Sequence, residues 1–402
     1  MSAIRDLREW IEPRRAEMVD DLAAYVRQET PSDDKVLLAS GLAWIEGWLD
    51  CRLGPPAART TFEGGEWGDT VVLDYPSGTG SGSWITALCH YDTVWPAGTL
   101  SGWPPTVEGD RFSGPGAFDM KAGLVQLVWA IRASRALGLP VPNVRLVLNG
   151  DEELGSPSSR AVIEREVLRG DAVLVFEASA GGALKTARKG VGIFEVTVEG
   201  REAHAGLDPS TGVSAIDEIA RVILRLHSQA DQSKGTTVNV GLVNGGTRTN
   251  VTAGRAHAAV DVRVSSDDEV RRITEVLETL ETRHPAATLT VEGEWNRPVM
   301  MRSPETGRLF AAAEAAAREI GIDLTEAFVG GASDGNFAAA LGLPVLDGLG
   351  AVGDGAHARN EWVSIDGMLE RTCLAGGLLA VLEGSPEAFL REPEAAANAG
   401  AR

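Results

Sequence analysis

Residues 84–92 read Trp-Ile-Thr-Ala-Leu-Cys-His-Tyr-Asp, an apolar run that ends in a histidine and an aspartate. Three further apolar runs have the length of buried strands, at residues 70–75, 144–148 and 172–176. Helical patterns at 121–137 and 158–168 separate the last three of the four strands. This alternation of strand and helix predicts an α/β fold with a mixed, largely parallel sheet. In such a sheet, functional side chains are expected at the carboxyl ends of the strands.

A different pattern begins near residue 191 and ends near residue 298. Its predicted elements follow the order β-α-β-β-α-β of a ferredoxin-like α+β module, at residues 192–199, 214–227, 237–243, 256–264, 267–283 and 288–294. The first pattern then resumes, with helices expected at 304–320, 334–341 and 367–382 and a strand at 344–346. We therefore expect a discontinuous first domain, residues 1–190 and 299–402, with a second domain, residues 191–298, inserted into it.

The two ends of the chain have simple expected structures. Residues 3–28 carry apolar side chains at helical spacing, which predicts one amphipathic helix. Residues 384–402 are rich in Ala, Glu, Pro and Gly, which is typical of a loose tail.

Composition excludes several classes of function. The formal net charge of −20 argues against nucleic-acid binding, which needs a basic face. Three cysteines in 402 residues, with a charged N-terminal stretch and no apolar span, indicate a reduced, cytoplasmic protein without a signal peptide or membrane helix. Because the cysteines lack zinc-finger spacing, any metal would be bound by histidines and carboxylates.

Residues of the metal-ligand type stand at three predicted strand ends and in two glycine-rich loops. They are His90, Asp92, Asp119, Asp151, Glu152, Glu153, Glu177 and His357. Each alone has an ordinary interpretation, since a single acid at a strand end is more often a cap and adjacent acids are often solvated. Together they favour divalent metals, because burying several carboxylates side by side without cations is costly.

Six segments, in this order, resemble the motifs of the M20 metallopeptidase and amidohydrolase family. They are Leu88–Val94, Gly114–Gly123, Asn149–Ser156, Phe176–Ala178, Gly330–Asp334 and His357–Glu361. The resemblance spans residues 84–365 and is closest to the bacterial glutamate carboxypeptidases. It implies a catalytic domain that binds two zinc ions, into which a lid and dimerisation domain is inserted.

The resemblance also implies a role for each ligand-type residue. Asp119 would bridge two zinc ions, with His90 and Glu177 on one and Glu153 and His357 on the other. Cobalt or manganese would also suit these ligands. Glu152 would be the general base that deprotonates the attacking water, and Asp92 would orient the imidazole of His90.

Residues of the inserted domain complete the site implied by the resemblance. His204, in the segment Gly200–Gly206, is similar to a histidine that reaches the active site of a neighbouring subunit and polarises the scissile carbonyl. A homodimer through residues 191–298 is therefore expected. Asn250 and Arg263 match the pair that binds the substrate α-carboxylate. Closure about hinges near residues 190 and 298 would bring that pair to the substrate.

Lys185 and Arg297 lie where glutamate-cleaving relatives place cations for the side-chain carboxylate of the released residue. If both have that role, the enzyme releases an acidic residue from an N-acyl amino acid or peptide. Two alternatives stay open: an M20 deacylase that removes an acetyl, succinyl or larger acyl group, and a non-catalytic binding protein on the same scaffold.

Overall fold

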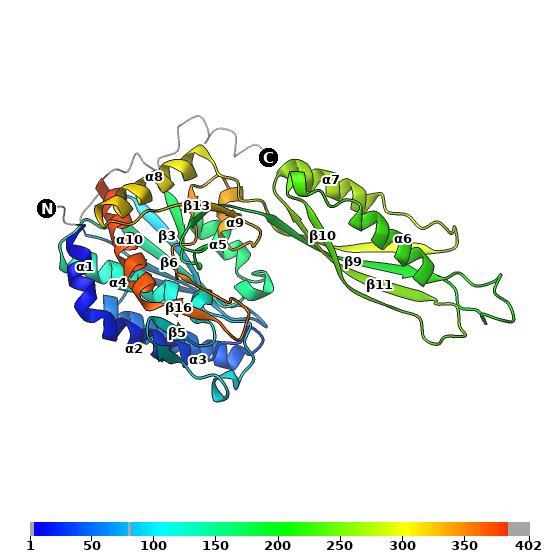
Figure 1. The fold of residues 1–402 in the computed structure, drawn as a ribbon, viewed down its shortest axis with the longest axis horizontal. Coiled ribbons are helices and arrows are strands. Elements are labelled where there is room, and N and C mark those ends of the chain that lie inside the picture. The colour runs from blue at the N-terminus through cyan, green and yellow to red at the C-terminus, as the bar shows by residue number, and fades with distance from the viewer. Residues whose placement is uncertain (1–3, 79–81, 385–402) are drawn as a thin grey trace. The chain divides into compact units, whose positions relative to one another are not determined.

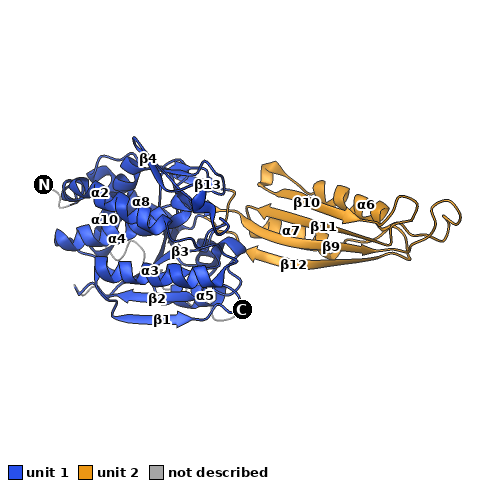
Figure 2. Ribbon diagram, turned by 90° about the horizontal axis from the view of Figure 1, so that it is seen from below, with its two compact units in different colours: residues 1–187, 302–329, 333–402 blue, residues 188–301, 330–332 orange. Residues whose placement is uncertain are grey.

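The computed structural model describes residues 4–78 and 82–384, and its contacts divide the chain into two compact units (Figures 1 and 2). Unit 1 comprises residues 1–187, 302–329 and 333–402, and unit 2 comprises residues 188–301 and 330–332. These divisions lie within three residues of those expected at 190 and 298, and the short segment 330–332 is an unexpected addition to unit 2. The expected tail beyond Gly384 lies outside the described residues.

Unit 1 is built on a six-stranded sheet in the order β1-β2-β6-β3-β7-β14. Its strands are β1 (Ala58–Phe62), β2 (Thr70–Tyr75), β3 (Trp84–His90), β6 (Asn143–Asn149), β7 (Ala172–Val175) and β14 (Val345–Leu346). Strands β6, β3, β7 and β14 are parallel, whereas β1, β2 and β6 pair antiparallel. The prediction of a mixed, largely parallel sheet is therefore confirmed, and the carboxyl ends of β3, β6 and β7 meet at one edge.

Helices surround this sheet, and the most buried of them is α4. They are α1 (Asp6–Ile11), α2 (Arg15–Val26), α3 (Lys35–Leu53), α4 (Ala122–Ala136), α5 (Arg160–Val167), α8 (Pro304–Glu319), α9 (Gly335–Ala340) and α10 (Ile365–Gly384). Helix α10 packs against α1, α4 and α8, and α5 packs against α9. In the described part of the chain, no helix combines the length and apolar character needed to cross a membrane.

The single helix predicted at residues 3–28 is wrong. The structure has α1, a 3₁₀ turn at Glu12–Arg14, and α2 in its place. Pro13 stands in that turn and lacks the N–H that a continuous helix would need.

Two small sheets position the loops of unit 1. One has the order β15-β16-β5-β4, from β4 (Thr106–Glu108), β5 (Arg111–Ser113), β15 (Gly353–Asp354) and β16 (Trp362–Ser364). The other pairs β8 (Leu184–Arg188) with β13 (Glu326–Val329). The first sheet holds residues 353–364 beside residues 106–113, although about 250 residues separate them in sequence.

Unit 2 has the predicted element order, with an antiparallel sheet in the order β10-β11-β9-β12. Its elements are β9 (Gly190–Glu199), α6 (Ala215–His227), β10 (Thr237–Gly245), β11 (Arg255–Val264), α7 (Asp267–Glu278) and β12 (Thr288–Arg297). Val196 and Val198 of β9 and Val260 and Val262 of β11 are buried, because alternate residues of each strand face the core beneath the helices.

Candidate active site

Asp119 lies at the centre of a cluster of histidines and carboxylates in unit 1. It belongs to the tight turn Ala117–Lys121 between β5 and α4, and its backbone is extended, with φ −117° and ψ 97°. Its Oδ1 atom is 3.3 Å from His90 Nε2, and its Oδ2 atom is 3.4 Å from His357 Nε2. The two oxygens of one carboxylate therefore face two different histidines.

His90, Asp119 and Glu177 form the first group of ligand-type atoms. His90 is the last residue of β3, and Glu177 follows the neighbouring parallel strand β7, so both lie at the same edge of the sheet. His90 Nε2 is 3.2 Å from Glu177 Oε1, while its Nδ1 lies 3.0 Å from the backbone oxygen of Asp92. A proton on Nδ1 leaves Nε2 of the neutral ring as the atom that faces the carboxylates.

Asp119, Glu153 and His357 form the second group. Glu153 lies in the short turn Glu152–Leu154, which follows β6 at the same sheet edge. His357 lies in the loop between β15 and β16, with a left-handed φ of 61°, and its Nε2 is 2.9 Å from Glu153 Oε2. The atoms of each group lie within 4.8 Å of one another.

Asp92 connects the two groups. Its Oδ1 atom lies 3.4 Å from His90 Nδ1 and accepts the backbone N–H of Glu152 at 3.2 Å. Its Oδ2 atom accepts the N–H of Glu153 at 3.2 Å and the hydroxyl of Ser32 at 2.8 Å. The sequence predicts the contact with His90, and the support that Asp92 gives to the 152–154 turn is an additional finding.

The cluster shifts the protonation of its own members. Burial lowers the pKa of His90, but hydrogen bonds to Asp119 and two further carboxylates outweigh it and raise that pKa well above its ordinary value. Hydrogen bonds to Asp119 and Glu153 raise the pKa of His357 to about 10. Burial raises the pKa of Glu153 to about 7, whereas hydrogen bonds from both histidines hold the pKa of Asp119 far below its usual range despite its burial. These groups are therefore strongly coupled by charge.

The donor set fits a pair of divalent metal ions. Each group offers one imidazole nitrogen and carboxylate oxygens, the ligands that zinc, cobalt and manganese share. Two ligands of a tetrahedral zinc ion, with bonds of about 2.0–2.1 Å, are about 3.3 Å apart. Three of the four histidine–carboxylate distances, at 3.2, 3.3 and 3.4 Å, have this spacing. They exceed the roughly 2.7–2.9 Å of a charged hydrogen bond.

Glu152 lies beside the second group. Its backbone N–H is fixed by Asp92, and the residue is partly exposed, as a group that exchanges protons with water needs to be.

Lys185 lies on β8, where its backbone exchanges hydrogen bonds of 2.8 and 3.1 Å with Asp347. Its side chain is partly buried.

The other predicted residues belong to unit 2. His204 is exposed, and its Nδ1 accepts the backbone N–H groups of Gly206 and Leu207, both at 3.1 Å. The neutral ring therefore carries its proton on Nε2, which makes that atom a hydrogen-bond donor. Asn250 is also exposed, and its backbone oxygen accepts the N–H of Ala205 at 3.0 Å, so the loops of His204 and Asn250 are neighbours.

The two arginines predicted to bind the substrate, Arg263 and Arg297, differ in how far solvent reaches them. Arg263 is partly exposed, although its Nε and one Nη atom each lie 3.1 Å from the carboxylate of Asp261. A third nitrogen donates to the backbone oxygen of Gly330 at 3.2 Å. Arg297 is only 3% exposed and donates to Asn296 at 3.1 Å, so its guanidinium offers little surface to a ligand in this structure.

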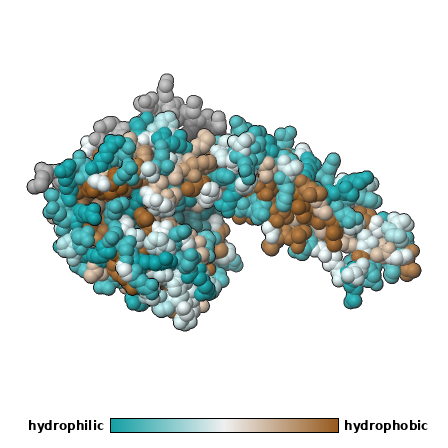
Figure 3. All heavy atoms as spheres, viewed as in Figure 1, coloured by the Kyte–Doolittle hydropathy of each residue, from teal (hydrophilic) through white to brown (hydrophobic). Residues whose placement is uncertain are grey.

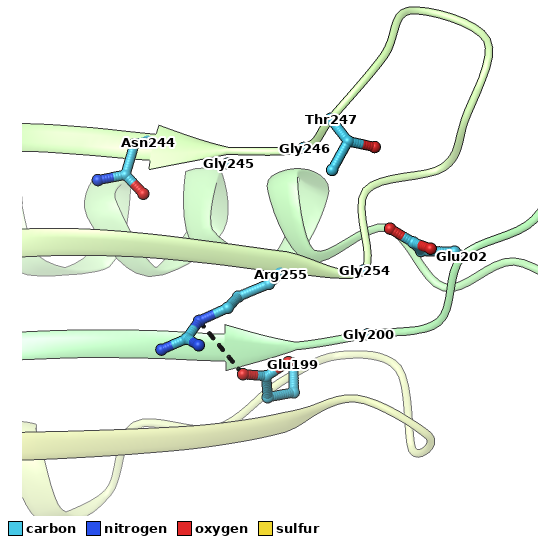
Figure 4. A pocket seen from close by; sticks show the side chains of 9 residues that line it. All are labelled: Glu199, Gly200, Glu202, Asn244, Gly245, Gly246, Thr247, Gly254 and Arg255. Atoms are coloured by element: carbon cyan, nitrogen blue, oxygen red, sulfur yellow. Dashed lines mark ion pairs between the residues drawn. The ribbon is translucent and has the colours of Figure 1, made fainter.

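An open pocket of about 670 Å³ lies at one end of the sheet of unit 2 (Figure 4). The ends of β9, β10 and β11 form its walls, and an ion pair of 3.4 Å joins Glu199 to Arg255. The loops with His204 and Asn250 leave the sheet from these walls, so the pocket opens beside the bases of both loops.

Two buried residues hold the site in ways that the sequence motifs do not indicate. Asp334 accepts hydrogen bonds from Asn149 at 2.8 Å and Ser156 at 2.5 Å, which fixes both ends of the segment with Glu152 and Glu153. Glu361 accepts backbone N–H groups from the turn of Asp119. Their presence in the motif segments 330–334 and 357–361 was the only signal in the sequence.

Comparisons with known proteins agree with this geometry. A model of peptidase family M20/M25/M40 matches residues 88–380. Carboxypeptidase G2 of Pseudomonas sp. (strain RS-16) is 29% identical over 369 residues, which cover 90% of this chain and 88% of that protein. A succinyl-diaminopimelate desuccinylase of Aromatoleum aromaticum is 31% identical over 71% of this chain and 79% of its own length.

A solved structure shares the fold over nearly the whole chain. The aminopeptidase PepT of Bacillus cereus superposes with a TM-score of 0.77 at 21% identity, over 92% of this chain and 98% of that protein. The family match covers all five residues of the two groups, from His90 to His357. The chain therefore belongs to peptidase family M20/M25/M40 and is a metallohydrolase.

Proposed function

We propose that this metallohydrolase binds two zinc ions and cleaves the amide bond of an N-acyl amino acid or a C-terminal residue with a free α-carboxylate. The observation that carries the proposal is Asp119, whose two oxygens face the two histidines of two separate ligand groups. Carboxypeptidase G2, which the chain resembles over 90% of its length, supports a carboxypeptidase. The resemblance of the sequence motifs to those of the bacterial glutamate carboxypeptidases favours a substrate that ends in glutamate.

The residues around the two groups have distinct tasks in this proposal. When bound, the metal ions lower the pKa of the attacking water and polarise the amide carbonyl. Glu152 accepts the proton of that water and delivers it to the leaving amine, for which its partly exposed position beside Glu153 is suitable. Asp92 fixes both the His90 ring and the backbone of residues 152 and 153.

Residues of unit 2 bind the substrate in this proposal. His204 donates a hydrogen bond from Nε2 to the carbonyl oxygen, and the two backbone N–H groups at Nδ1 support that tautomer. Arg263 and Asn250 bind the α-carboxylate, and Arg263 exchanges part of its contact with Asp261 for the substrate.

A homodimer through residues 191–298 is part of the proposal. Strand β10 is an edge strand of nine residues, and an unpaired edge is a template for pairing with another chain. Leu242 and Val243 of β10 and Leu224 of α6 are exposed apolar residues. Figure 3 shows apolar side chains gathered on a face of unit 2. A second copy of the chain would cover such a surface and bring its own His204 loop.

Arg297 gives a reason to keep a second candidate function. If Lys185 and Arg297 were both accessible to the substrate, their charges would favour release of an acidic residue. Because Arg297 is 3% exposed, the structure gives the acidic pocket less support than the metal centre. A deacylase, as the desuccinylase relative suggests, would need no cation at residue 297.

The test is a hydrolysis screen of the full chain with added zinc. The panel consists of N-acyl amino acids and dipeptides that differ only in the C-terminal residue. Glu152→Ala is the inactive variant, and Glu108→Ala, an exposed acid on β4, is the matched control with retained activity. Release of glutamate or aspartate supports the carboxypeptidase. Release of only neutral or basic residues keeps the hydrolase and removes the roles of Lys185 and Arg297. No release from any substrate by metal-loaded protein overturns the proposal.

A further inference from the structure

Glu361 is a buried carboxylate without a task in the proposed chemistry. It lies four residues after His357, next to β16, and is 0% exposed. A carboxylate removed from water needs hydrogen-bond donors to remain ionised and stable. The origin of those donors indicates what Glu361 does.

Four donors surround the carboxylate. Oε1 accepts the backbone N–H groups of Phe118 at 2.7 Å and Asp119 at 3.1 Å. Oε2 accepts the backbone N–H of Gly116 and the indole N–H of Trp95, both at 3.0 Å. Two of the four donors thus belong to the turn that carries Asp119, and a third, Gly116, directly precedes it.

That turn depends on an outside acceptor. Asp119 precedes α4, which begins at Ala122, and its backbone is not helical, so its N–H lies outside the hydrogen-bond ladder of that helix and needs another acceptor. The backbone of Glu361 is itself fixed: its N–H donates to Ala358 at 2.9 Å, and its carbonyl accepts the Ser113 hydroxyl at 2.7 Å. One residue therefore joins the loop of His357 to the turn of Asp119.

We propose that Glu361 is a positioning residue of the metal centre, which sets the backbone of Asp119 relative to His357. The inference rests on the proposed function, in which Asp119 is the ligand shared by both groups. Glu361 acts through the backbone of the turn and does not touch the substrate.

Glu361→Gln is the direct test. The amide of glutamine keeps one acceptor oxygen, but its NH₂ group replaces the other oxygen and cannot accept a hydrogen bond. The two N–H groups that donated to the replaced oxygen therefore lose their acceptor. Residues that hold metal ligands in place typically change metal affinity about 10–100-fold when replaced. We expect the dissociation constants of both metal ions to rise by about that factor, because the turn positions the ligand that they share.

Asp21→Asn is the matched control. Asp21 is also a buried carboxylate of unit 1, and it accepts the indole N–H of Trp129 at 2.9 Å. The full chain, as wild type and both variants, is titrated with Zn²⁺ against a chelator and with Co²⁺ by visible absorption, well below each unfolding temperature. Asp21→Asn should lower thermal stability and leave metal affinity unchanged. Equal affinities of wild type and Glu361→Gln overturn the inference, whereas a wild type that binds no metal overturns the proposed function.

Trp95→Phe provides a milder second variant if Glu361→Gln does not fold. It removes one donor from Oε2 and keeps an aromatic ring at that position. Trp48→Phe is its control, since Trp48 is a buried tryptophan of α3 whose ring stacks on Trp44. A several-fold loss of metal affinity in Trp95→Phe beyond that in Trp48→Phe supports the inference. Equal titrations of the two variants reject it.

Discussion

Asp119 contributes an oxygen to each ligand group, whereas Glu177 belongs to only one. We therefore expect Asp119→Ala to lose both metal ions and Glu177→Ala to lose one. The measurement is the zinc content per chain after dialysis against a weak chelator. A full metal pair in Asp119→Ala, or the loss of both ions in Glu177→Ala, would contradict the shared-ligand arrangement.

Metal uptake by these residues should release protons. In the metal-free protein the pKa of His357 is raised to about 10 and that of Glu153 to about 7. Because a metal ion needs the unprotonated ligand, protons compete below these pKa values. Apparent affinity should fall as the pH drops from 9 to 6, most steeply below about 7. Calorimetry in buffers of different ionisation enthalpy checks this, and a heat that is independent of buffer would refute it.

Single residues differ in how far the sequence predicts them. His90 and Glu177 end adjacent parallel strands, so the strand-end rule alone places them together. Glu361 is different, because its partners are backbone N–H groups more than 240 residues earlier, and every residue type except proline supplies these. The burial of Arg297 could not be predicted either, since nothing in the sequence distinguishes a buried arginine from one on the surface.

At the scale of elements, α7 offers a matched pair of ion pairs. Glu269 pairs with Arg272 at 2.6 Å and accepts the Thr236 hydroxyl, with a side chain 6% exposed. Asp268 also pairs with the arginine three residues after it, Arg271, but the side chain of Asp268 is 85% exposed. Glu269→Gln should cost about 1.5–3 kcal/mol of the stability of unit 2. Asp268→Asn should cost less than about 1 kcal/mol.

The contribution of Glu269 should also depend on pH. The hydrogen bond with Arg272 lowers the pKa of Glu269 to about 2, from an ordinary value of 4.5. The unfolded state therefore takes up the proton first as the pH falls, so this stability is complete above 4.5 and is lost toward pH 2. Hydrogen exchange of the β9 and β11 amides in the full chain measures it. A difference between wild type and Glu269→Gln that is unchanged at pH 3 would contradict this explanation.

Helix α3 is an element that the sequence analysis missed despite a usable signal. Asp34 caps it by accepting the N–H groups of Val36 and Leu37, and its buried residues Leu38, Leu42 and Ile45 have helical spacing. The strands β4, β5, β15 and β16 gave no such signal, because two or three residues are too few to show a period of two. Long strands such as β9 were predicted because one of their faces is buried.

At the scale of the whole molecule, the proposed dimer can be tested through β10. Leu242 is 69% exposed, so Leu242→Lys should leave the fold of unit 2 intact and weaken association by burying a charge in the interface. Val107→Lys on β4 is the matched control, since Val107 is also exposed but lies in unit 1. Sedimentation should show a monomer only for Leu242→Lys, with reduced activity if His204 acts in the partner's site. A monomeric wild type would refute the dimer.

The division into units was predictable only in part. Periodicity changes near residues 190 and 298 because a sheet with one buried face replaces one covered on both faces. The segment 330–332 carries no such signal, since it joins unit 2 through its backbone oxygens, which Arg188 and Arg263 bind.

The discontinuity of unit 1 has a consequence for how the protein is made. His90, Asp119 and Glu177 all precede unit 2 in the chain, whereas His357 follows it. At about 5–20 residues per second, a ribosome needs roughly 10–40 s to pass from Glu177 to His357. During that interval the nascent chain contains every residue of one ligand group and only part of the other. The two ligand groups are therefore completed at different times during synthesis. Strand β14, which pairs with β7 in the sheet, is made only shortly before the second group is complete.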